Sequence, residues 1–205
     1  RGLTVIGQAV ARSTAELYRL IQVEATRGDE VLVAPGLAFS ARIANETLGR
    51  RLVTMHLQPS CFISVHESAV MHPWLASINR WPPALKRLVL RLGDRVADRA
   101  LAPGVNTLRA ELGLPSVRHI VSEWWHSPQR VIGLFPTWYG ATQPDWPRQT
   151  ALTGFPLYDE RGATLIEPDL DLFLAEGGDR PVVFVAGSGN RQASRFFAAA
   201  TDACH

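Results

Sequence analysis

The residues Gly187-Ser188-Gly189-Asn190 have the types and the spacing of a phosphate-binding turn. They follow the apolar run PVVFVA at 181–186, which predicts a parallel strand buried on both faces, and they precede helical spacing of apolar residues at 191–203. A strand–turn–helix leaves unpaired backbone N–H groups and a positive dipole end at the turn, which favours an anion. In the alternative interpretation, the turn is an ordinary one in which Asn190 caps the helix and contacts no ligand.

A second group of polar and aromatic residues follows a predicted strand at 51–57. It comprises His56, Gln58 and Ser60, then an irregular loop at 58–81 that carries Trp74 and Trp81. Loops after the carboxyl end of a strand are where α/β folds place ligand sites, and indole rings suit flat apolar ligands. The sequence therefore predicts a ligand pocket here; the alternative is a histidine satisfied in the core beside a Pro-Ser turn.

The same loop contains His66-Glu67 and His72, which invites comparison with a zinc site. In the HExxH motif the second histidine stands four residues after the first, where this chain has Val70. The two histidines therefore cannot share one helix face, and we expect no metal site.

The rest of the chain alternates predicted helices and strands with short connections, which is typical of an α/β fold with a parallel sheet. The predicted helices span 8–27, 37–48, 82–101, 104–112 and 169–175, and the further strands span 30–34 and 131–135. Residues 136–150 are rich in proline and aromatic side chains, which predicts a linker between two domains.

The long helix from 82 carries an arginine at every fourth position, at Arg87, Arg91, Arg95 and Arg99. The opposite face holds Leu85, Leu88, Val89, Leu92 and Val96. A helix on a membrane surface has this pattern, but Asp94 and Asp98 can pair with the arginines at helical spacing. We therefore expect a solvated outer face and do not favour peripheral membrane contact.

Composition excludes some classes of partner and sets the compartment. The formal net charge is only +2 and the charges alternate, so nothing indicates a nucleic-acid partner. No apolar run reaches the roughly 20 residues that span a bilayer. Cys61 and Cys204 are far apart in the sequence and form no CxxC pattern, so we expect reduced thiols and a cytoplasmic protein.

Three segments in this order resemble a known family: VLVAPGLAFSARIANETLGRRLVTMHLQPS at 31–60, QTALTGFPLYD at 149–159 and PVVFVAGSGNRQASRFFAA at 181–199. The chain resembles bacterial GT-B glycosyltransferases, of the type that glycosylates natural products, sterols or lipids. Any one segment alone is a weak signal, and the ordered set is more specific.

The resemblance implies a two-domain enzyme that moves a sugar from a nucleotide-sugar donor to an acceptor hydroxyl, without a metal or another cofactor and with inversion. Residues 1–135 would be part of the Rossmann-like acceptor domain, 136–150 the linker, and 151–205 the first strand and helix of the donor domain. The turn at 187–190 would then contact the donor, and His56, Gln58, Ser60, Trp74 and Trp81 would line the acceptor pocket.

The sequence also departs from the family pattern. A glycine-rich loop with the base histidine would precede Arg1, and a His-Gly-Gly-type donor segment would follow His205, so we expect an incomplete and inactive piece with an unidentified base. Many members carry an aspartate after the strand at 30–34, where this chain has Pro35. Two alternatives remain: a non-catalytic nucleotide- or ligand-binding module, and a structural fragment that forms homodimers through exposed sheet edges.

Overall fold

The computed structural model describes residues 2–70, 75–158, 167–176, 181–187 and 193–204. The chain divides into two compact units, Arg1–Leu157 and Tyr158–His205, and each is described by itself. Within the described residues, no helix is both long enough and apolar enough to cross a membrane.

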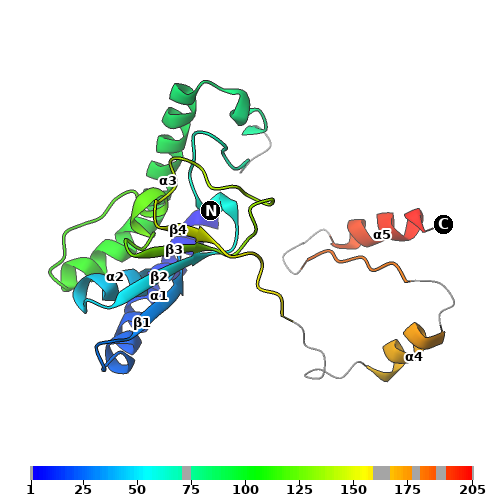
Figure 1. The fold of residues 1–205 in the computed structure, drawn as a ribbon, viewed down its shortest axis with the longest axis horizontal. Coiled ribbons are helices and arrows are strands. Elements are labelled where there is room, and N and C mark those ends of the chain that lie inside the picture. Colours follow the sequence, from blue (N-terminus) through cyan, green and yellow to red (C-terminus); the bar gives the residue numbers. More distant parts are fainter. Residues whose placement is uncertain (1, 71–74, 159–166, 177–180, 188–192, 205) are drawn as a thin grey trace. The chain divides into compact units, whose positions relative to one another are not determined.

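The first unit is built on a four-stranded parallel sheet. Its strands β1 (Val31–Pro35), β2 (Arg51–His56), β3 (Arg130–Gly133) and β4 (Thr150–Leu152) lie side by side in chain order (Figure 1). The register pairs Val33 with Val53, Thr54 with Val131, and Ile132 with Ala151. The unit is thus α/β and Rossmann-like, as the alternation of predicted elements indicated.

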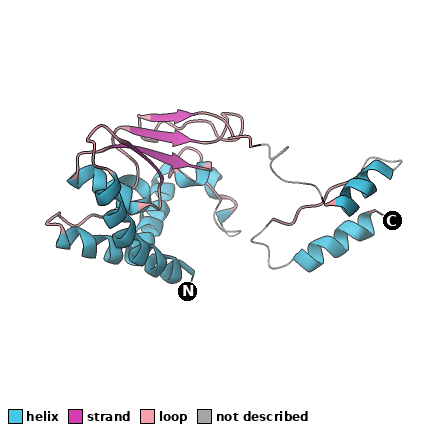
Figure 2. Ribbon diagram, turned by 90° about the horizontal axis from the view of Figure 1, so that it is seen from below, coloured by secondary structure: helices cyan, strands magenta, loops and turns pink. Residues whose placement is uncertain are grey.

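The helices α1 (Gly2–Glu24), α2 (Phe39–Thr47) and α3 (Pro83–Glu111) lie on one face of the sheet (Figure 2). Right-handed crossovers between strands that follow one another in a single direction place every connection on the same side. The main core forms there, around the buried side chains of Tyr18, Phe39, Ile43, Val105 and Ile120. On the first strand, the side chains of Val31 and Val33 are exposed.

Small residues let α1 and α3 approach closely. A Cβ atom on Gly104 would overlap that of Ala11, and one on Gly7 would overlap the carbonyl oxygen of Ala100. The backbones of the two helices are therefore in close contact where they cross. A larger side chain at Gly7 or Gly104 would force the helices apart.

The predicted helices at 82–101 and 104–112 are one helix, α3, which continues through Pro103. Proline removes one backbone hydrogen bond in a helix interior and usually breaks the helix. Here Leu101 and Val105 are buried on either side of Pro103, and this packing keeps the two segments on one axis. The prediction of two helices was wrong because it weighed the local effect of proline without the packing.

The N-terminal half of α3 buries other residues than the predicted apolar ones. Lys86 and Asp94 are buried, and the arginines of the predicted outer face are exposed as expected. The apolar residues opposite them are exposed as well, namely Leu85, Leu88, Leu92 and Val96. The predicted pairing of Asp94 and Asp98 with arginines is also wrong, because both carboxylates accept hydrogen bonds from residues 119–122.

The segment predicted as a linker, 136–150, packs into the first unit. Trp146 is buried against Phe62 and Phe135 in a second core cluster, and β4 follows at once and pairs with β3. The boundary between the units comes later, after Leu157. The prolines and aromatic residues of this segment thus belong to an irregular loop that packs against the core.

The second unit contains α4 (Pro168–Glu176) and α5 (Ala193–Ala203). The predicted strand at 181–185 is not formed: these residues belong to no strand, and Val182, Val183 and Val185 are each more than 70% exposed. A buried parallel strand needs neighbours on both sides, and no described residue pairs with this segment. The prediction of a strand buried on both faces is therefore wrong for the described residues.

Candidate functional site

His56, at the carboxyl end of β2, is the final acceptor in a series of hydrogen bonds between aromatic rings. The indole Nε1 of Trp125 can only donate, and it lies 3.1 Å from Nε2 of His126. His126 therefore carries its hydrogen on Nδ1, which donates to Nε2 of His56 at 3.1 Å. The bonds run in one direction, from Trp125 through His126 to His56, and both histidines are neutral.

Burial sets the charge state of this pair. Desolvation lowers the pKa of His56 to about 4, and desolvation with the neighbouring His56 lowers that of His126 to about 3. The ring of His56 also packs against Phe62 and against the backbone of Gly36, where a Cβ atom would lie 2.5 Å from Cε1. The surroundings of His56 are thus those of a buried histidine whose hydrogen bond is satisfied within the core.

The other described residues of the predicted acceptor pocket do not take part in these ring hydrogen bonds. Gln58 is exposed, Ser60 is half-buried in the 3-10 turn η1 (Pro59–Cys61), and Trp81 donates from Nε1 to the hydroxyl of Ser77 at 3.0 Å. Trp74 lies outside the described residues. None of these described side chains lines the pocket considered next.

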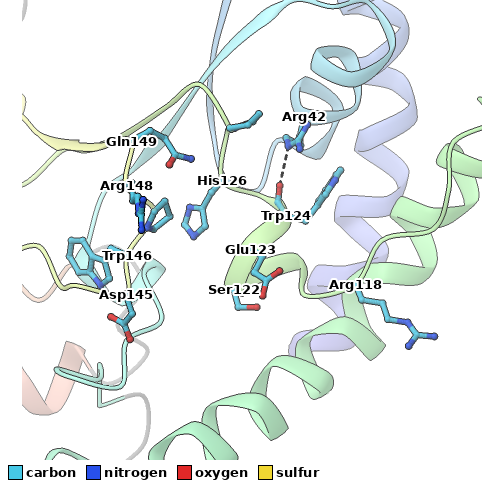
Figure 3. Close-up of a pocket in the computed structure, with 12 residues that line it drawn as sticks. Arg42, Arg118, Ser122, Glu123, Trp124, His126, Asp145, Trp146, Arg148 and Gln149 are labelled. Atoms are coloured by element: carbon cyan, nitrogen blue, oxygen red, sulfur yellow. Dashed lines mark hydrogen bonds between the residues drawn. The ribbon is translucent and has the colours of Figure 1, made fainter. Parts of the chain in front are cut away.

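An open pocket of about 610 Å³ lies beside the edge strand β4 (Figure 3). One wall is the π-helical turn η4 (Ile120–Trp124) with the segment 126–128, and the other is the segment 145–149 that leads into β4. The turn is π-helical because Trp124 and Trp125 donate to carbonyls five residues earlier. Such turns occur often at functional sites, since the wider turn re-aims the side chains around it.

Trp124 is fixed at this pocket by a network of charges from two helices. Its Nε1 donates to Oε1 of Glu46, and its carbonyl accepts from Nε of Arg42. Glu46 also forms ion pairs of 2.9 Å with Arg42 and 2.7 Å with Arg109, and both guanidinium groups lie over the indole ring. A single carboxylate thus orients the indole and forms ion pairs with two cations.

Trp146 forms the opposite wall and has an unused donor. Its ring stacks on Phe62 at a centroid distance of 4.2 Å, and only 7% of the residue is exposed. Its Nε1 is buried without a hydrogen-bond acceptor among the described residues. A buried N–H without an acceptor costs about 1–3 kcal/mol, so a ligand oxygen that accepts from it would bind favourably.

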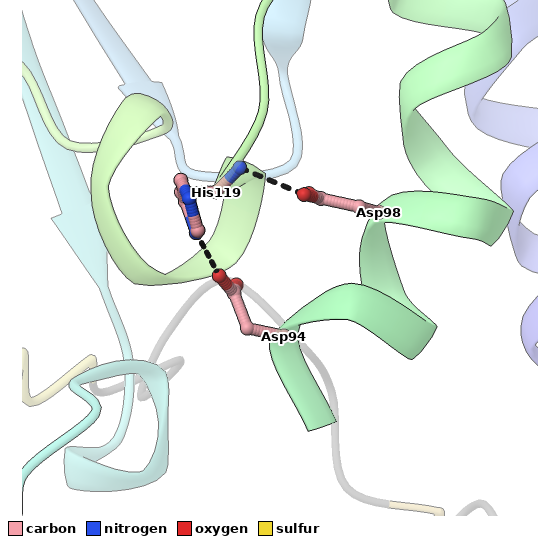
Figure 4. A group of neighbouring side chains, drawn as sticks. All are labelled: Asp94, Asp98 and His119. Carbon is pink, nitrogen blue, oxygen red and sulfur yellow. Dashed lines mark hydrogen bonds and ion pairs between the residues drawn. The ribbon is translucent and has the colours of Figure 1, made fainter. Parts of the chain in front are cut away.

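A carboxylate–histidine dyad adjoins the pocket (Figure 4). Nδ1 of His119 lies 2.5 Å from Oδ2 of Asp94, and the hydroxyl of Ser122, which lines the pocket, donates to the same oxygen at 2.9 Å. Asp98 accepts from the backbone N–H groups of His119 and Ile120, which holds His119 at φ 56°. The hydrogen bond to Asp94 raises the pKa of His119, whose side chain is 50% exposed.

The oxygen and nitrogen atoms of Asp94, Asp98 and His119 lie within 4.8 Å of one another, the spacing of a possible metal site. However, a separation of 2.5 Å is that of a direct hydrogen bond, and an ion with bonds near 2.0–2.2 Å does not fit between these two atoms. Both oxygens of Asp98 are already occupied by backbone donors. In the structure, Asp94 and His119 therefore form a hydrogen-bonded carboxylate–histidine pair.

The predicted donor turn lies mostly outside the described residues. Gly187 has φ +77°, a conformation that favours glycine and suits a tight turn. Ser188, Gly189 and Asn190 are not described, and neither is His72 of the rejected zinc pattern.

Sequence reasoning missed His119, Ser122, His126 and Trp146. One signal was present: Asp94 and Asp98 are the only acidic residues of the sequence between 83 and 99 and stand one turn apart, so their carboxylates could bind partners from outside the helix. No family model matches the chain, and no curated protein is significantly similar to it.

Proposed function

We propose that this chain is part of a nucleotide-sugar-dependent glycosyltransferase that transfers a sugar to a hydroxyl of a small hydrophobic or lipid-like acceptor, without a metal and with inversion. Two lines of support are the ordered resemblance of segments 31–60, 149–159 and 181–199, and the Rossmann-like parallel sheet of the first unit. A third is the pocket beside β4, which we assign to the acceptor.

The observation that carries the proposal is a pocket with aromatic walls, in which one wall residue has a buried N–H without an acceptor among the described residues. Trp124 and Trp146 provide apolar surface, and Nε1 of Trp146 has no acceptor among the described residues. A hydroxylated apolar molecule matches both features, since its rings or chain cover the indoles and its oxygen accepts the N–H. A purely anionic ligand would leave the apolar surface of the indoles uncovered.

We assign the role of base to the dyad, because Ser122, which shares the Asp94 carboxylate with His119, lines the pocket. With Nδ1 held by Asp94, the Nε2 atom of a neutral His119 accepts a proton from an acceptor hydroxyl, and Asp94 stabilises the imidazolium that forms. The hydroxyl oxygen then attacks the anomeric carbon, and the nucleoside diphosphate leaves with the bonding electrons. In this proposal the turn at 187–190 binds that diphosphate through its backbone N–H groups.

Ligand binding to the chain tests the acceptor site. We expect hydroxylated flat compounds, such as sterols and phenols, to bind and to shift the signal of the Trp146 indole N–H in NMR spectra. Trp146→Phe keeps an aromatic ring and removes only the donor, so affinity should fall about five- to tenfold. Trp81→Phe is the matched control, because its indole also donates but lies outside the pocket. Equal affinities for the two variants, or no binding of any such compound, would contradict the proposal.

The module alternative makes a different prediction in the same experiment. A nucleotide-binding module would bind nucleotides and ignore the hydroxylated compounds.

The self-associating fragment is favoured by one observation, the exposed apolar run at 182–185. Light scattering tests it, since a monomer at all concentrations counts against pairing through this segment.

A further inference from the structure

The N-terminal half of α3 presents an apolar stripe to solvent. Leu85, Leu88, Leu92 and Val96 follow one another at intervals of three and four residues and are 44–54% exposed. In Figure 1 this half of the helix extends away from the sheet. Four large apolar side chains on one exposed helix face indicate a surface that meets an apolar partner.

The stripe faces outward because the polar residues of this half-helix have partners inside. Nζ of Lys86 donates to the carbonyl oxygen of His66 at 3.0 Å, and Asp94 is bound by His119 and Ser122. Both residues are about 96% buried. If the helix turned so that the leucines faced inward, Lys86 and Asp94 would lose these hydrogen bonds. The hydrogen bonds therefore fix the orientation of this half-helix.

The charges beside the stripe are all of one sign. Arg87, Arg91, Arg95 and Arg99 are exposed, and none forms an ion pair in the part of the chain that the structure describes. The acidic residues of this half-helix are Asp94, which is buried, and Asp98, which is occupied by two backbone N–H groups. At 100° per residue, the arginines run along one flank of the apolar stripe.

The first helix shows that this combination is specific to α3. Leu17 and Leu20 of α1 are also exposed, but Glu16 and Glu24 stand among its arginines, Arg12 and Arg19. The surface of α1 thus carries both signs of charge, whereas residues 83–99 expose arginines without carboxylates.

We propose that residues 83–99 bind the surface of a membrane that contains anionic lipids, with the stripe of Leu85, Leu88, Leu92 and Val96 in the outer acyl region and the arginines at the headgroups. A helix with one apolar face and long cationic side chains along its flank lies in the plane of such an interface. Charge complementarity selects this occupant, because a solely apolar partner would leave four arginines unused. This helix surface shares no residue with the lining of the acceptor pocket.

Sedimentation of the full chain with lipid vesicles tests the proposal. We expect binding to phosphatidylcholine vesicles that contain phosphatidylserine, much weaker binding to phosphatidylcholine alone, and loss of binding at high salt. The double variant Arg91→Glu/Arg95→Glu should lower the partition coefficient at least about tenfold. Its matched control is Arg12→Glu/Arg19→Glu on α1, for which we expect less than about a twofold change.

A second pair of variants tests the apolar contribution. Leu88→Ser/Leu92→Ser should also lower binding about tenfold, and Leu17→Ser/Leu20→Ser should leave it nearly unchanged. All four positions are exposed, so folding is preserved, which circular dichroism confirms for each variant.

Two results would overturn the proposal. One is an absence of binding to anionic vesicles, or binding that ignores the arginine substitutions. The other is a dimer in light scattering that dissociates on Leu88→Ser/Leu92→Ser, because a second copy of the chain would then cover the stripe.

Discussion

Nδ1 of His126 donates a hydrogen bond to Nε2 of His56 in a setting where neither ring has a counter-charge. His126 is 6% exposed and His56 3% exposed, and the aromatic rings of Phe62 and Trp125 surround them. The pair is a neutral polar link within the core, since protonation of either ring would break the donor–acceptor sequence. This makes the fold sensitive to acid.

We expect the free energy of unfolding to fall as the pH falls below about 6.5. The pKa is about 4 for His56 and about 3 for His126, against 6.5 in the unfolded chain. Between these values the unfolded chain binds protons at both histidines and the folded chain does not. The stability that the pair contributes is complete above 6.5 and is lost as the pH falls towards the folded pKa values. The loss should be on the order of 3 kcal/mol by about pH 5, measured by urea denaturation.

The variant His126→Gln retains a hydrogen-bonding side chain and removes one titrating group, so about half of this pH dependence should disappear. His66→Gln, at an exposed position, is the control and should retain it. The raised pKa of His119 acts in the opposite direction, but that side chain is half-exposed and solvent screens it. Stability that does not change between pH 7 and 5 would contradict the burial of a neutral pair.

Two glycines of α3 should respond oppositely to alanine. Gly93→Ala meets no atom within 4 Å and gains helix propensity, so it should stabilise the protein by up to about 1 kcal/mol. Gly104→Ala gains the same propensity, but its Cβ atom overlaps that of Ala11 and forces α1 away from α3. We expect a net destabilisation of about 1–3 kcal/mol for Gly104→Ala in thermal or chemical unfolding. Equal effects would mean that α1 and α3 do not cross closely at Gly104.

Glu46 should be the most sensitive single contact of the pocket wall. Glu46→Ala leaves Arg109, which is 2% exposed, without its ion pair and removes the acceptor of the Trp124 indole. Breaking a buried pair in this way costs about 3–5 kcal/mol, and here we expect the lower figure because Glu46 is partly exposed. Glu16→Ala on the exposed side of α1 should change stability by less than about 0.5 kcal/mol in the same urea titration.

The regular elements that the sequence predicted are those with strong local periodicity. The β-branched runs at 31–34 and 51–55 are strands and the helix at 37–48 is α2, within a few residues of the predicted bounds. The strand β4 has three residues, too few to show a period, so the sequence places Thr150 in the predicted linker and Ala151 and Leu152 in the predicted second domain. The run at 181–185 has strand composition, but a strand also needs a neighbour to pair with.

The orientation of α3 and the composition of the pocket depend on contacts that no local pattern contains. Hydrophobic periodicity predicts that α3 is amphipathic, but which face turns inward is decided by Lys86 with His66 and by Asp94 with His119, 20 and 25 residues apart. The pocket joins Arg42 to Trp124 across 82 residues. The loop at 58–81 seemed the natural ligand site from the strand before it, whereas the described pocket lies beside a different strand.

The dyad can be measured directly through the pKa of His119. The hydrogen bond to Asp94 is the largest cause of its rise, with smaller contributions from the charges of Asp94, Glu123 and Asp98. Asp94→Asn removes both the charge and the carboxylate acceptor, so the pKa of His119 should fall towards 6.5 in an NMR titration of its ring protons. Asp98→Asn leaves the ring hydrogen bond in place and should produce a smaller fall. If the two variants shift the pKa equally, His119 senses only the general negative charge of α3, and Asp94 does not orient it as a base.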